Sequence, residues 1–553
     1  MPPTAVGVVD TVLGAVAPPG PGRTGFLANF APGSSGVEAL VARGCVNPGD
    51  GGGGVFAWLP ASAVADDGGT VVIPNPYAAM TPVPAGRWHR VYTGALDVRW
   101  FGAQGNPSTT SDTAAFANAI AASAGIGPAA NREIFVPPGQ YLAQLTLPRR
   151  GVNAGGIALR GAGPASTQIM WNGAGATVEF SHADDTQFAM YYRFSSIAFR
   201  NTSPGGTAFR HAPDPTLAAR MLYAAFEDVL FQSDGVAQDA NQQPVGNQPV
   251  AELRSMFNSR LDRVSLRGSA GLLITGSRNH LADVHTVLDG EQTDGVVLAP
   301  GGESILDTIR IDGLFGNIGD GIRLSGCALV SIRNSSFEGK RGRSCIRIED
   351  SSNITLDNCN MGGAPFANVP WAALWITGAS DNIRIDGGRI NVFDITGLRI
   401  DPGGRSIHGR EIQFPQSSAA AAGTFPIIDA LAPDIRLELI TGTDARVELA
   451  HTVGRSAFRG TILLLQRWHD LFVSDAPLIE HIMQGTDNDG PGLADAPPGR
   501  RVTLFLSGGA TTVASGGNST IRLVGNTAWT PAGQAMIELV FDGKLWWEVA
   551  RNG

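Results

Sequence analysis

Five acidic residues in the middle of this 553-residue chain recur at spacings that could bring their carboxylates together. Asp289, Asp312 and Glu338 each precede a glycine at the end of a short apolar segment, and Asp294 and Asp320 each precede the glycine that begins another. Two carboxyl groups about 5–9.5 Å apart can cleave a glycosidic bond, because one protonates the leaving oxygen while the other acts as nucleophile or base. Their mutual repulsion separates the two pKa values, which suits those roles. We take these five residues as candidate catalytic groups.

A simpler explanation exists for each acid. Asp-Gly is an ordinary turn dipeptide, so the same residues could serve only to turn the chain. The clustering of all five within residues 289–338 favours a site, as does the neighbouring basic loop with Lys340, Arg341 and Arg343, which could bind an acidic glycan. His285 is a further candidate base, although a single histidine is more often structural.

Short repeated segments supply a second set of candidates. Each has a small residue first and aliphatic residues second and fourth, and they begin at positions 271, 295, 321, 345, 373 and 397. Because side chains alternate along a strand, the third residue of each segment should point outward. The resulting stack is Leu273, Val297, Arg323, Arg347, Trp375 and Arg399. The preceding strand gives a second outward series, Arg310, Arg333 and Arg384.

Arginines stacked roughly 5 Å apart would form a basic stripe able to bind carboxylate or sulfate groups of a sugar. Trp375 could stack on a sugar ring. The candidate substrate-binding residues are therefore Arg310, Arg323, Arg333, Arg347, Trp375 and Lys340. The competing interpretation is a solvated exterior or a contact between subunits.

The same repeat predicts the fold. The segments recur every 24 to 28 residues, with about three short strands per repeat and almost no helical pattern, which is typical of a solenoid of stacked strands. A right-handed parallel β-helix fits best, because the regular spacing of leucine-rich repeats is absent. Asparagines 334, 353, 358 and 382 stand at the expected turns, where they tolerate left-handed backbone. The predicted fold class is all-β.

Three regions differ in pattern. Residues 1–95 combine short strands with glycine turns and form a small N-terminal region. Residues 96–434 form the β-helix. Residues 435–553 form a separate C-terminal antiparallel β domain, in which alternation around Asp542-Gly543 predicts a hairpin over 536–550.

One helix is predicted, over residues 110–124, where it caps the β-helix. Thr110 or Ser111 can cap its N-terminus, and Phe116 and Ile120 share its buried face.

Composition excludes several classes of protein. With 43% hydrophobic residues and 72 glycines without a Gly-X-Y period, the chain is neither disordered nor collagenous. The net charge of −9 argues against a general nucleic-acid binder. No apolar run is long enough to span a membrane, and the N-terminus lacks the basic segment of a secretory signal. The four cysteines, Cys45, Cys327, Cys345 and Cys359, are expected to be reduced, buried thiols, and their spacing suggests no metal site.

Three segments, in this order, resemble the start of pectate-lyase-like β-helices. They are DVRWFGAQGNPSTTSDTAAFANAIAASA (97–124), IFVPPGQYLA (134–143) and IALRGAGPASTQI (157–169). The preceding PGDGGGGVFAWLPASAVADDGGTVVIP, with GRW after it, resembles the N-terminal segment of bacteriophage tail-spike proteins. The similarity to tail spikes covers most of the chain.

This resemblance implies a homotrimer on the virion tail that binds, and usually cleaves, a bacterial surface polysaccharide. It implies that residues 1–95 attach the protein to the phage tail or baseplate, and that residues 435–553 serve trimerisation or glycan binding. The NTD, DD, GHG and RIK motifs of polygalacturonases do not occur here in that order, so no catalytic residue is carried over. No cofactor, nucleic acid or membrane insertion is implied.

Three functions remain open. The first is endo-glycosidic hydrolysis of capsule, lipopolysaccharide or exopolysaccharide by two of the five acids. The second is β-elimination on a uronic acid, with Lys340, Arg310 or His285 as the base. The third is receptor binding without catalysis. A secreted bacterial enzyme fits less well, because the N-terminus resembles an anchor and lacks a signal.

Overall fold

The computed structural model divides the chain into two compact units. Unit 1 comprises residues 1–234 and 250–265, and unit 2 comprises residues 235–249 and 266–553. The described residues are 5–12, 37–74, 80–107, 111–124, 132–149, 155–181, 188–214, 216, 219–234, 248–268, 270–288, 294–313, 318–364, 372–392, 396–401, 403–414, 428–430, 435–438, 441–442, 445–449, 468–473, 480–483, 501–506, 521–527, 529, 535–542 and 544–552.

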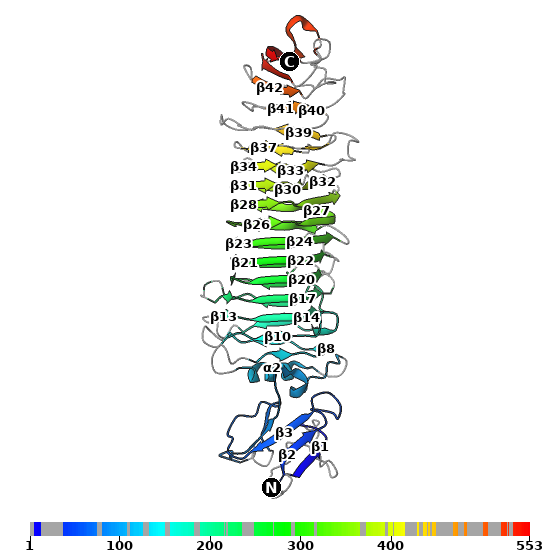
Figure 1. Cartoon of the computed structure of the whole chain (residues 1–553), viewed down its shortest axis with the longest axis vertical. Helices are drawn as coiled ribbons and strands as arrows, with labels where there is room; N and C mark the ends of the chain where they lie inside the picture. The colour runs from blue at the N-terminus through cyan, green and yellow to red at the C-terminus, as the bar shows by residue number, and fades with distance from the viewer. Residues whose placement is uncertain are drawn as a thin grey trace. The chain divides into compact units, whose positions relative to one another are not determined.

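Unit 1 begins with a five-stranded sheet of order β1-β2-β3-β5-β4 (Figure 1). Its strands are β1 (Ala5–Val9), β2 (Val37–Ala42), β3 (Gly54–Leu59), β4 (Val71–Val72) and β5 (Arg87–Arg90). Leu40, Phe56 and Trp88 are fully buried in its core. Gly49 and Gly51 have positive φ in the loop before β3, a conformation that glycine adopts without strain. These are the short strands and glycine turns that the sequence predicts.

A helix follows, as predicted. The elements here are β6 (Leu96–Asp97), the 3-10 helix η3 (Val98–Phe101) and α2 (Thr113–Ala122). Phe116 and Ile120 lie on the buried face of α2, as expected. The N-cap position belongs to Asp112 and not to either predicted residue, and its side chain caps no helix amide. Its carboxylate instead accepts the backbone N–H of Gln104 at 2.8 Å, because the carboxylate is buried against that loop.

The rest of unit 1 consists of parallel strands stacked rung on rung (Figure 1). They are β7 (Ile134–Phe135), β8 (Gly139–Leu142), β9 (Leu145–Leu147), β10 (Ala158–Arg160), β11 (Thr167–Trp171), β12 (Val178–Phe180), β14 (Arg193–Asn201), β15 (Phe209–His211), β17 (Ala225–Ser233) and β18 (Ala251–Leu253), and β20 (Arg260–Gly268) begins in this unit. An additional parallel sheet contains β13 (Ala189–Met190), β16 (Met221–Leu222) and β19 (Met256–Phe257). Like residues stack in register: Phe194 pairs with Phe226, and Phe199 with Phe231.

Unit 2 repeats the same arrangement with shorter turns. Its stacked strands are β21 (Leu272–Ser277), β22 (His280–Leu288), β23 (Val296–Gly302), β24 (Ile305–Gly313), β25 (Ile318–Ser325), β26 (Ser331–Arg333), β27 (Ser336–Glu349), β28 (Ser352–Asp357), β29 (Asn360–Ala364), β30 (Ala372–Thr377), β31 (Asp381–Asp386), β32 (Arg389–Val392), β33 (Thr396–Ile400), β34 (Arg405–Arg410), β35 (Gln413–Phe414), β36 (Ile428–Ala430), β37 (Ile435–Glu438), β38 (Thr441–Gly442), β39 (Ala445–Leu449) and β40 (Trp468–Val473). Register pairs such as Ile322 with Ile346 and Ile346 with Leu374 put aliphatic residues above one another in the interior.

Parallel pairing continues past residue 435, where the sequence predicts that the β-helix ends. β37 pairs with β34, and β40 pairs with β39, so stacked strands reach Val473. A mixed sheet of order β41-β42-β44-β45-β43 follows. Its strands are β41 (Glu480–Met483), β42 (Arg501–Leu506), β43 (Ile521–Arg522), β44 (Ala535–Phe541) and β45 (Trp546–Asn552), with the 3-10 helix η6 (Val524–Asn526). β44 and β45 are antiparallel, which confirms the predicted hairpin.

Among the described residues, corners with left-handed backbone recur on successive rungs of both units, from Tyr191 to Glu411. Asn334, Asn353, Asn358 and Asn382 have φ of 49°, 55°, 51° and 52°, as the sequence predicts for these turns. The Asn358 amide donates to Asn334 at 3.0 Å, and the Asn382 amide donates to Asn353 at 2.6 Å. Asparagine therefore stabilises these corners in two ways: it tolerates the left-handed backbone conformation, and its side-chain amide bonds the asparagine of a neighbouring rung.

All four cysteines are free and buried, as predicted. Burial raises the pKa of Cys45 to about 12 and that of Cys359 to about 11, so these thiols stay protonated at neutral pH. In the part of the chain that the structure describes, no helix is both long and apolar enough to cross a membrane.

Candidate functional site

Two of the five candidate acids occupy one strand position on adjacent rungs. Asp312 of β24 pairs in register with Glu338 of β27, as the sequence predicts. Asp289 does not complete the series, because Val287 is the register partner of Asp312 on the preceding rung. The predicted three-acid alignment is therefore wrong at Asp289, which itself lies outside the described residues, as does the side chain of Glu338.

Asp312 is the centre of a polar cluster. His285 Nε2 lies 2.8 Å from Asp312 Oδ2, and Arg310 Nε lies 3.2 Å from the same oxygen. His285 and Arg310 are register neighbours on β22 and β24, so the cluster spans two adjacent rungs. All three side chains are partly exposed and can be reached from solvent. A carboxylate bonded to one ring nitrogen orients the imidazole and fixes which nitrogen faces outward, which suits His285 to the role of a general base.

The contact between Arg310 and Asp312 is not specific to this cluster. Arg384 Nε lies 2.6 Å from Asp386, again two residues along the same strand. Strand alternation puts residues i and i+2 on one face, so the triplet Arg-Ile-Asp forms this pair wherever it occurs. The distinguishing feature of Asp312 is therefore His285, together with Glu338 in register one rung away.

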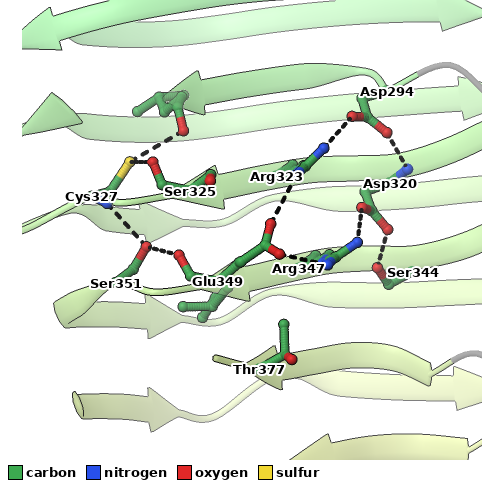
Figure 2. A network of polar contacts seen from close by, with 12 residues as sticks. Asp294, Asp320, Arg323, Ser325, Cys327, Ser344, Arg347, Glu349, Ser351 and Thr377 are labelled. Carbon is green, nitrogen blue, oxygen red and sulfur yellow. Dashed lines mark hydrogen bonds and ion pairs between the residues drawn. The ribbon is translucent and has the colours of Figure 1, made fainter. Parts of the chain in front are cut away.

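Asp294 and Asp320 also meet, at a second place (Figure 2). The backbone N–H of Asp320 donates to Asp294 Oδ1 at 2.7 Å, and the hydroxyl of Ser344 donates to the Asp320 carboxylate. Arg347 lies 3.8 Å from Asp320 and Arg323 lies 3.7 Å from Asp294. Asp320 has no exposed surface. It can therefore position Arg347 but cannot touch a glycan in this chain, whereas Asp294 remains partly exposed.

The predicted outward stack is present, but it is not a basic stripe. The register places Arg323 beside Arg347, and Glu349 bonds both guanidinium groups at 2.8 Å (Figure 2). With Asp294 and Asp320 also in contact, each of these two arginines already has carboxylate partners in its own chain. The stack is thus a ladder of alternating charge, which leaves little positive charge for an anionic sugar.

Trp375 is covered on both sides by this ladder. Arg347 precedes it in register and lies 4.6 Å from the ring centroid, and Arg399 follows it at 5.4 Å. Its Nε1 donates to Asp401 at 2.9 Å, and Arg399 Nε donates to the same carboxylate at 2.9 Å. The expectation that Trp375 stacks on a sugar ring is therefore wrong, because arginines occupy the positions above and below the ring.

The second predicted arginine series does not form a stack. Arg310 pairs in register with His285 and Ser336, whereas Arg333 pairs with Asp307 and Asp357, and Asp307 lies three residues before Arg310 on β24. Arg384 pairs with Thr355 and His408, at yet another position. The sequence pattern misaligned these segments because Ile-Arg occurs at several strand positions. The remaining substrate-binding candidate, the side chain of Lys340, lies outside the described residues.

Sequence reasoning missed two residues of the ladder, Glu349 and Asp401. Their signal is local: Arg347-Ile-Glu349 and Arg399-Ile-Asp401 place an acid two residues after an arginine on the same face. Burial opposes ionisation of Asp401, but hydrogen bonds from Thr377, Arg399 and Trp375 outweigh it and lower the pKa of this carboxyl. Among the described residues, no group of three or more His, Cys, Asp or Glu side chains could hold a metal ion.

Comparison with solved structures finds distant similarities. The enzymatically active domain of tailspike protein 2 from bacteriophage CBA120 aligns at 15% identity and a TM-score of 0.41, over 74% of this chain and 54% of that one. The tailspike of Acinetobacter baumannii phage AM24 aligns at 13% identity and 0.38, over 79% and 63%. The A-module of a mannuronan C-5 epimerase from Azotobacter vinelandii aligns at 12% and 0.37, over 73% and 96%.

This chain spans about half the length of the two CBA120 tailspike 2 structures that it matches. A search of the curated proteins gives no match. The family described as the right handed beta helix region matches residues 257–412. This segment contains both acidic pairs, Asp312 with Glu338 and Asp294 with Asp320. The predicted right-handed parallel β-helix is confirmed there.

Proposed function

We propose that the protein is a phage tail spike that binds and depolymerises a bacterial surface polysaccharide by endo-glycosidic hydrolysis. One observation carries the proposal: Asp312 stands in register with Glu338 and is bonded to His285 at a solvent-accessible place on the β-helix. The sequence resemblance to tail spikes supplies the class of substrate.

Hydrolysis needs two carboxyl groups with different roles. Corresponding residues on adjacent rungs are about 5 Å apart, which is the separation that retaining glycosidases use. In the proposed reaction Asp312 attacks the anomeric carbon, and Glu338 protonates the leaving oxygen. Glu338 then activates the water that releases the sugar from Asp312. Contacts with His285 and Arg310 hold the Asp312 carboxylate in place at the rung surface, which suits the role of nucleophile.

The contact between His285 and Asp312 also supports a second reaction, β-elimination on a uronic acid. His285, oriented by Asp312, would abstract the proton next to the sugar carboxylate, and Arg310 would neutralise that carboxylate. The product of elimination contains a double bond and absorbs in the near ultraviolet, whereas the product of hydrolysis does not.

Assembly and attachment are part of the same proposal. We infer a homotrimer at the virion tail, attached to tail or baseplate through residues 1–95. The C-terminal sheet is the proposed clamp, in which Trp546 is fully buried while Trp547 and Val549 are exposed apolar groups of β45. Deleting residues 501–553 should give monomer or aggregate in light scattering, and a truncated protein that remains trimeric would contradict the clamp.

The test of the site compares two aspartates in the same local setting. Asp312 and Asp386 both follow Arg-Ile, both bond that arginine, and their side chains are 21% and 23% exposed. Asp312→Asn should lower depolymerisation about 10²–10⁴-fold, with unchanged melting, whereas Asp386→Asn should stay within a few-fold of wild type. Glu338→Gln should resemble Asp312→Asn. The fall in polysaccharide mass is the readout.

Each result has one meaning. Equal activity of the Asp312 and Asp386 variants would show that Asp312 only makes the intrastrand pair, and would remove it from the site. Loss of activity on His285→Ala with an absorbing wild-type product would select elimination over hydrolysis. Binding of polysaccharide without any fall in mass would select the non-enzymatic receptor-binding spike.

A further inference from the structure

Two tyrosines project from consecutive corners of unit 1. Tyr191 and Tyr223 are 52% and 47% exposed, which is unusual for large aromatic side chains. Their rings are stacked, with centroids 5.2 Å apart and planes inclined by 11°. Together they form a continuous aromatic surface that spans two rungs.

The backbone at these corners gives no reason for tyrosine. Tyr191 and Tyr223 follow the paired residues Met190 and Leu222 and have φ of 59° and 55°. Left-handed backbone costs an ordinary L-residue roughly 1–2 kcal/mol, and asparagine tolerates it better. The next rung has Asn258 at the same corner, with φ of 50°. Neither conformation nor burial therefore favours an aromatic residue at either corner, which points to a use for the exposed rings.

The tyrosines border a strip of half-buried apolar side chains. Met190, Leu222 and Phe257 are the second residues of β13, β16 and β19, and they pair in register on three successive rungs. Each is partly exposed. The guanidinium of Arg220 lies 5.2 Å over the ring of Phe257 and is itself exposed. The surface thus combines aromatic faces, phenol hydroxyls and one cation over a length of about 10 Å, the distance across three strands.

We propose that this tyrosine strip, made of Tyr191, Tyr223 and the residues beside them, binds two or three sugar residues of the polysaccharide outside the catalytic cluster. Apolar faces of the sugar rings pack on the aromatic and aliphatic side chains, phenol hydroxyls bond sugar hydroxyls, and Arg220 meets an acidic substituent. The proposal rests on the proposed polysaccharide substrate.

Such a strip increases the affinity for the polymer and does not change the rate of bond cleavage. A polymer offers many sugar repeats, so some can occupy the strip while others react, whereas a short oligosaccharide in the catalytic cluster has no repeats left for the strip. The strip therefore predicts that its loss weakens binding of polymer and raises KM for polymer, while kcat and the cleavage of short oligosaccharides stay unchanged.

The test uses the full chain with Tyr191→Asn and Tyr223→Asn combined, because asparagine suits this corner at position 258. The probes are surface polysaccharides extracted from a panel of bacterial strains and immobilised for binding measurements. Affinity should fall about 10-fold or more for two lost aromatic contacts, and Tyr191→Phe with Tyr223→Phe should retain most of it. The matched control is Leu329→Ala, because Leu329 is 54% exposed at the corresponding corner in unit 2, with φ of 59°.

The outcomes separate this inference from the proposed function. Unchanged polymer binding in the double asparagine variant would overturn the tyrosine strip and leave the proposed function intact. A wild-type protein that binds none of the polysaccharides would overturn both. A changed oligomeric state in either tyrosine variant, seen by light scattering, would overturn the strip as a glycan site and assign it to a subunit contact.

Discussion

The stacked rungs of unit 1 and those of unit 2 share a fold but differ in what fills them and in how long their turns are. Unit 1 is packed with aromatic rings, namely Phe180, Tyr192, Phe194, Phe199, Phe209, Phe226 and Phe231. Unit 2 is packed mainly with isoleucine and leucine. Corresponding corners Tyr191, Tyr223 and Asn258 are 32 and 35 residues apart, whereas the corners from Arg278 to Ser406 are 24 to 29 apart.

This difference explains why the repeat of the β-helix can be recognised in the sequence of unit 2 but not in that of unit 1. A period near 25 was visible only where turns are short and where the same aliphatic residues recur at fixed strand positions, from about residue 271 to 400. The family match, over residues 257–412, covers nearly the same segment. In unit 1 the longer turns carry an extra strand in β13, β16 and β19, so equally regular stacking leaves no fixed period.

The largest expected effect concerns the aromatic packing. Phe209 contacts the rings of five phenylalanines and is fully buried. Phe209→Ala should lower the free energy of unfolding by about 3–5 kcal/mol, because it removes a ring and leaves a cavity. Ile346→Val in unit 2 removes one methyl group and should cost about 0.5–1.5 kcal/mol. Urea denaturation of the full chain measures both, and equal losses would show that the aromatic cluster is loosely packed.

The next effect concerns the N-terminal sheet. The sequence predicts a domain boundary between this sheet and the β-helix at residue 95, but side-chain contacts cross that position. Arg90 donates to the carbonyl oxygens of Gly52, Gly53 and Gly69 and lies over the rings of Phe56 and Trp100. It therefore joins the sheet to the start of the β-helix. Arg90→Ala should cost about 3 kcal/mol, because buried carbonyls lose a charged donor.

A chain that begins at Leu96 provides the companion test. It would expose Trp100, whose ring Arg90 covers, so we expect a lower melting temperature with glycan activity retained. Unchanged melting in both variants would restore residue 95 as a domain boundary.

A smaller effect is expected from the charge ladder of unit 2. Glu349 bonds both Arg323 and Arg347 and is mostly buried. Glu349→Gln should cost about 1–3 kcal/mol, because two partly buried guanidinium groups lose a charged acceptor. Glu303, paired with Arg278 at an exposed corner, is the control, and Glu303→Gln should have no measurable effect. If both glutamines are equally tolerated in thermal denaturation, the ladder contributes nothing to stability.

These contacts show where sequence reasoning succeeds and where it ends. Strand alternation correctly predicted that Arg323, Arg347 and Trp375 stack, because register follows the buried residues between them. Alternation also places Glu349 beside Arg347 on the same strand, but it does not show that Glu349 reaches Arg323 on the adjacent rung, because that contact depends on the register. Nor could it separate Asp312 from other turn acids, because His285 lies 27 residues away in sequence and meets it only through the register.

The smallest expected effects are two opposite pH dependences, one in each unit. Burial raises the pKa of Asp112 despite its bond from Gln104, whereas hydrogen bonds and the charge of Arg399 lower the pKa of Asp401 despite its burial. Asp401 therefore adds stability above the ordinary aspartate pKa of about 3.9, and this contribution is lost as pH falls through its lowered pKa.

For Asp112 the sign is reversed. The folded state holds its proton more tightly than the unfolded state, so stability falls as pH rises from about 3.9 through the raised pKa, and the cost of the buried charge persists at neutral pH. Asp112→Asn keeps an oxygen to accept from Gln104 and should leave stability at pH 7 unchanged or slightly higher, whereas Asp401→Asn should lower it slightly. Toward pH 3 the Asp112 difference should disappear, because Asp112 becomes protonated in the wild type, whereas the Asp401 difference should persist to lower pH, because the pKa of its carboxyl is lowered. Melting curves from pH 3 to 7 measure the two trends, and parallel pH profiles for both variants would contradict the assignment of opposite shifts to the two carboxyl groups.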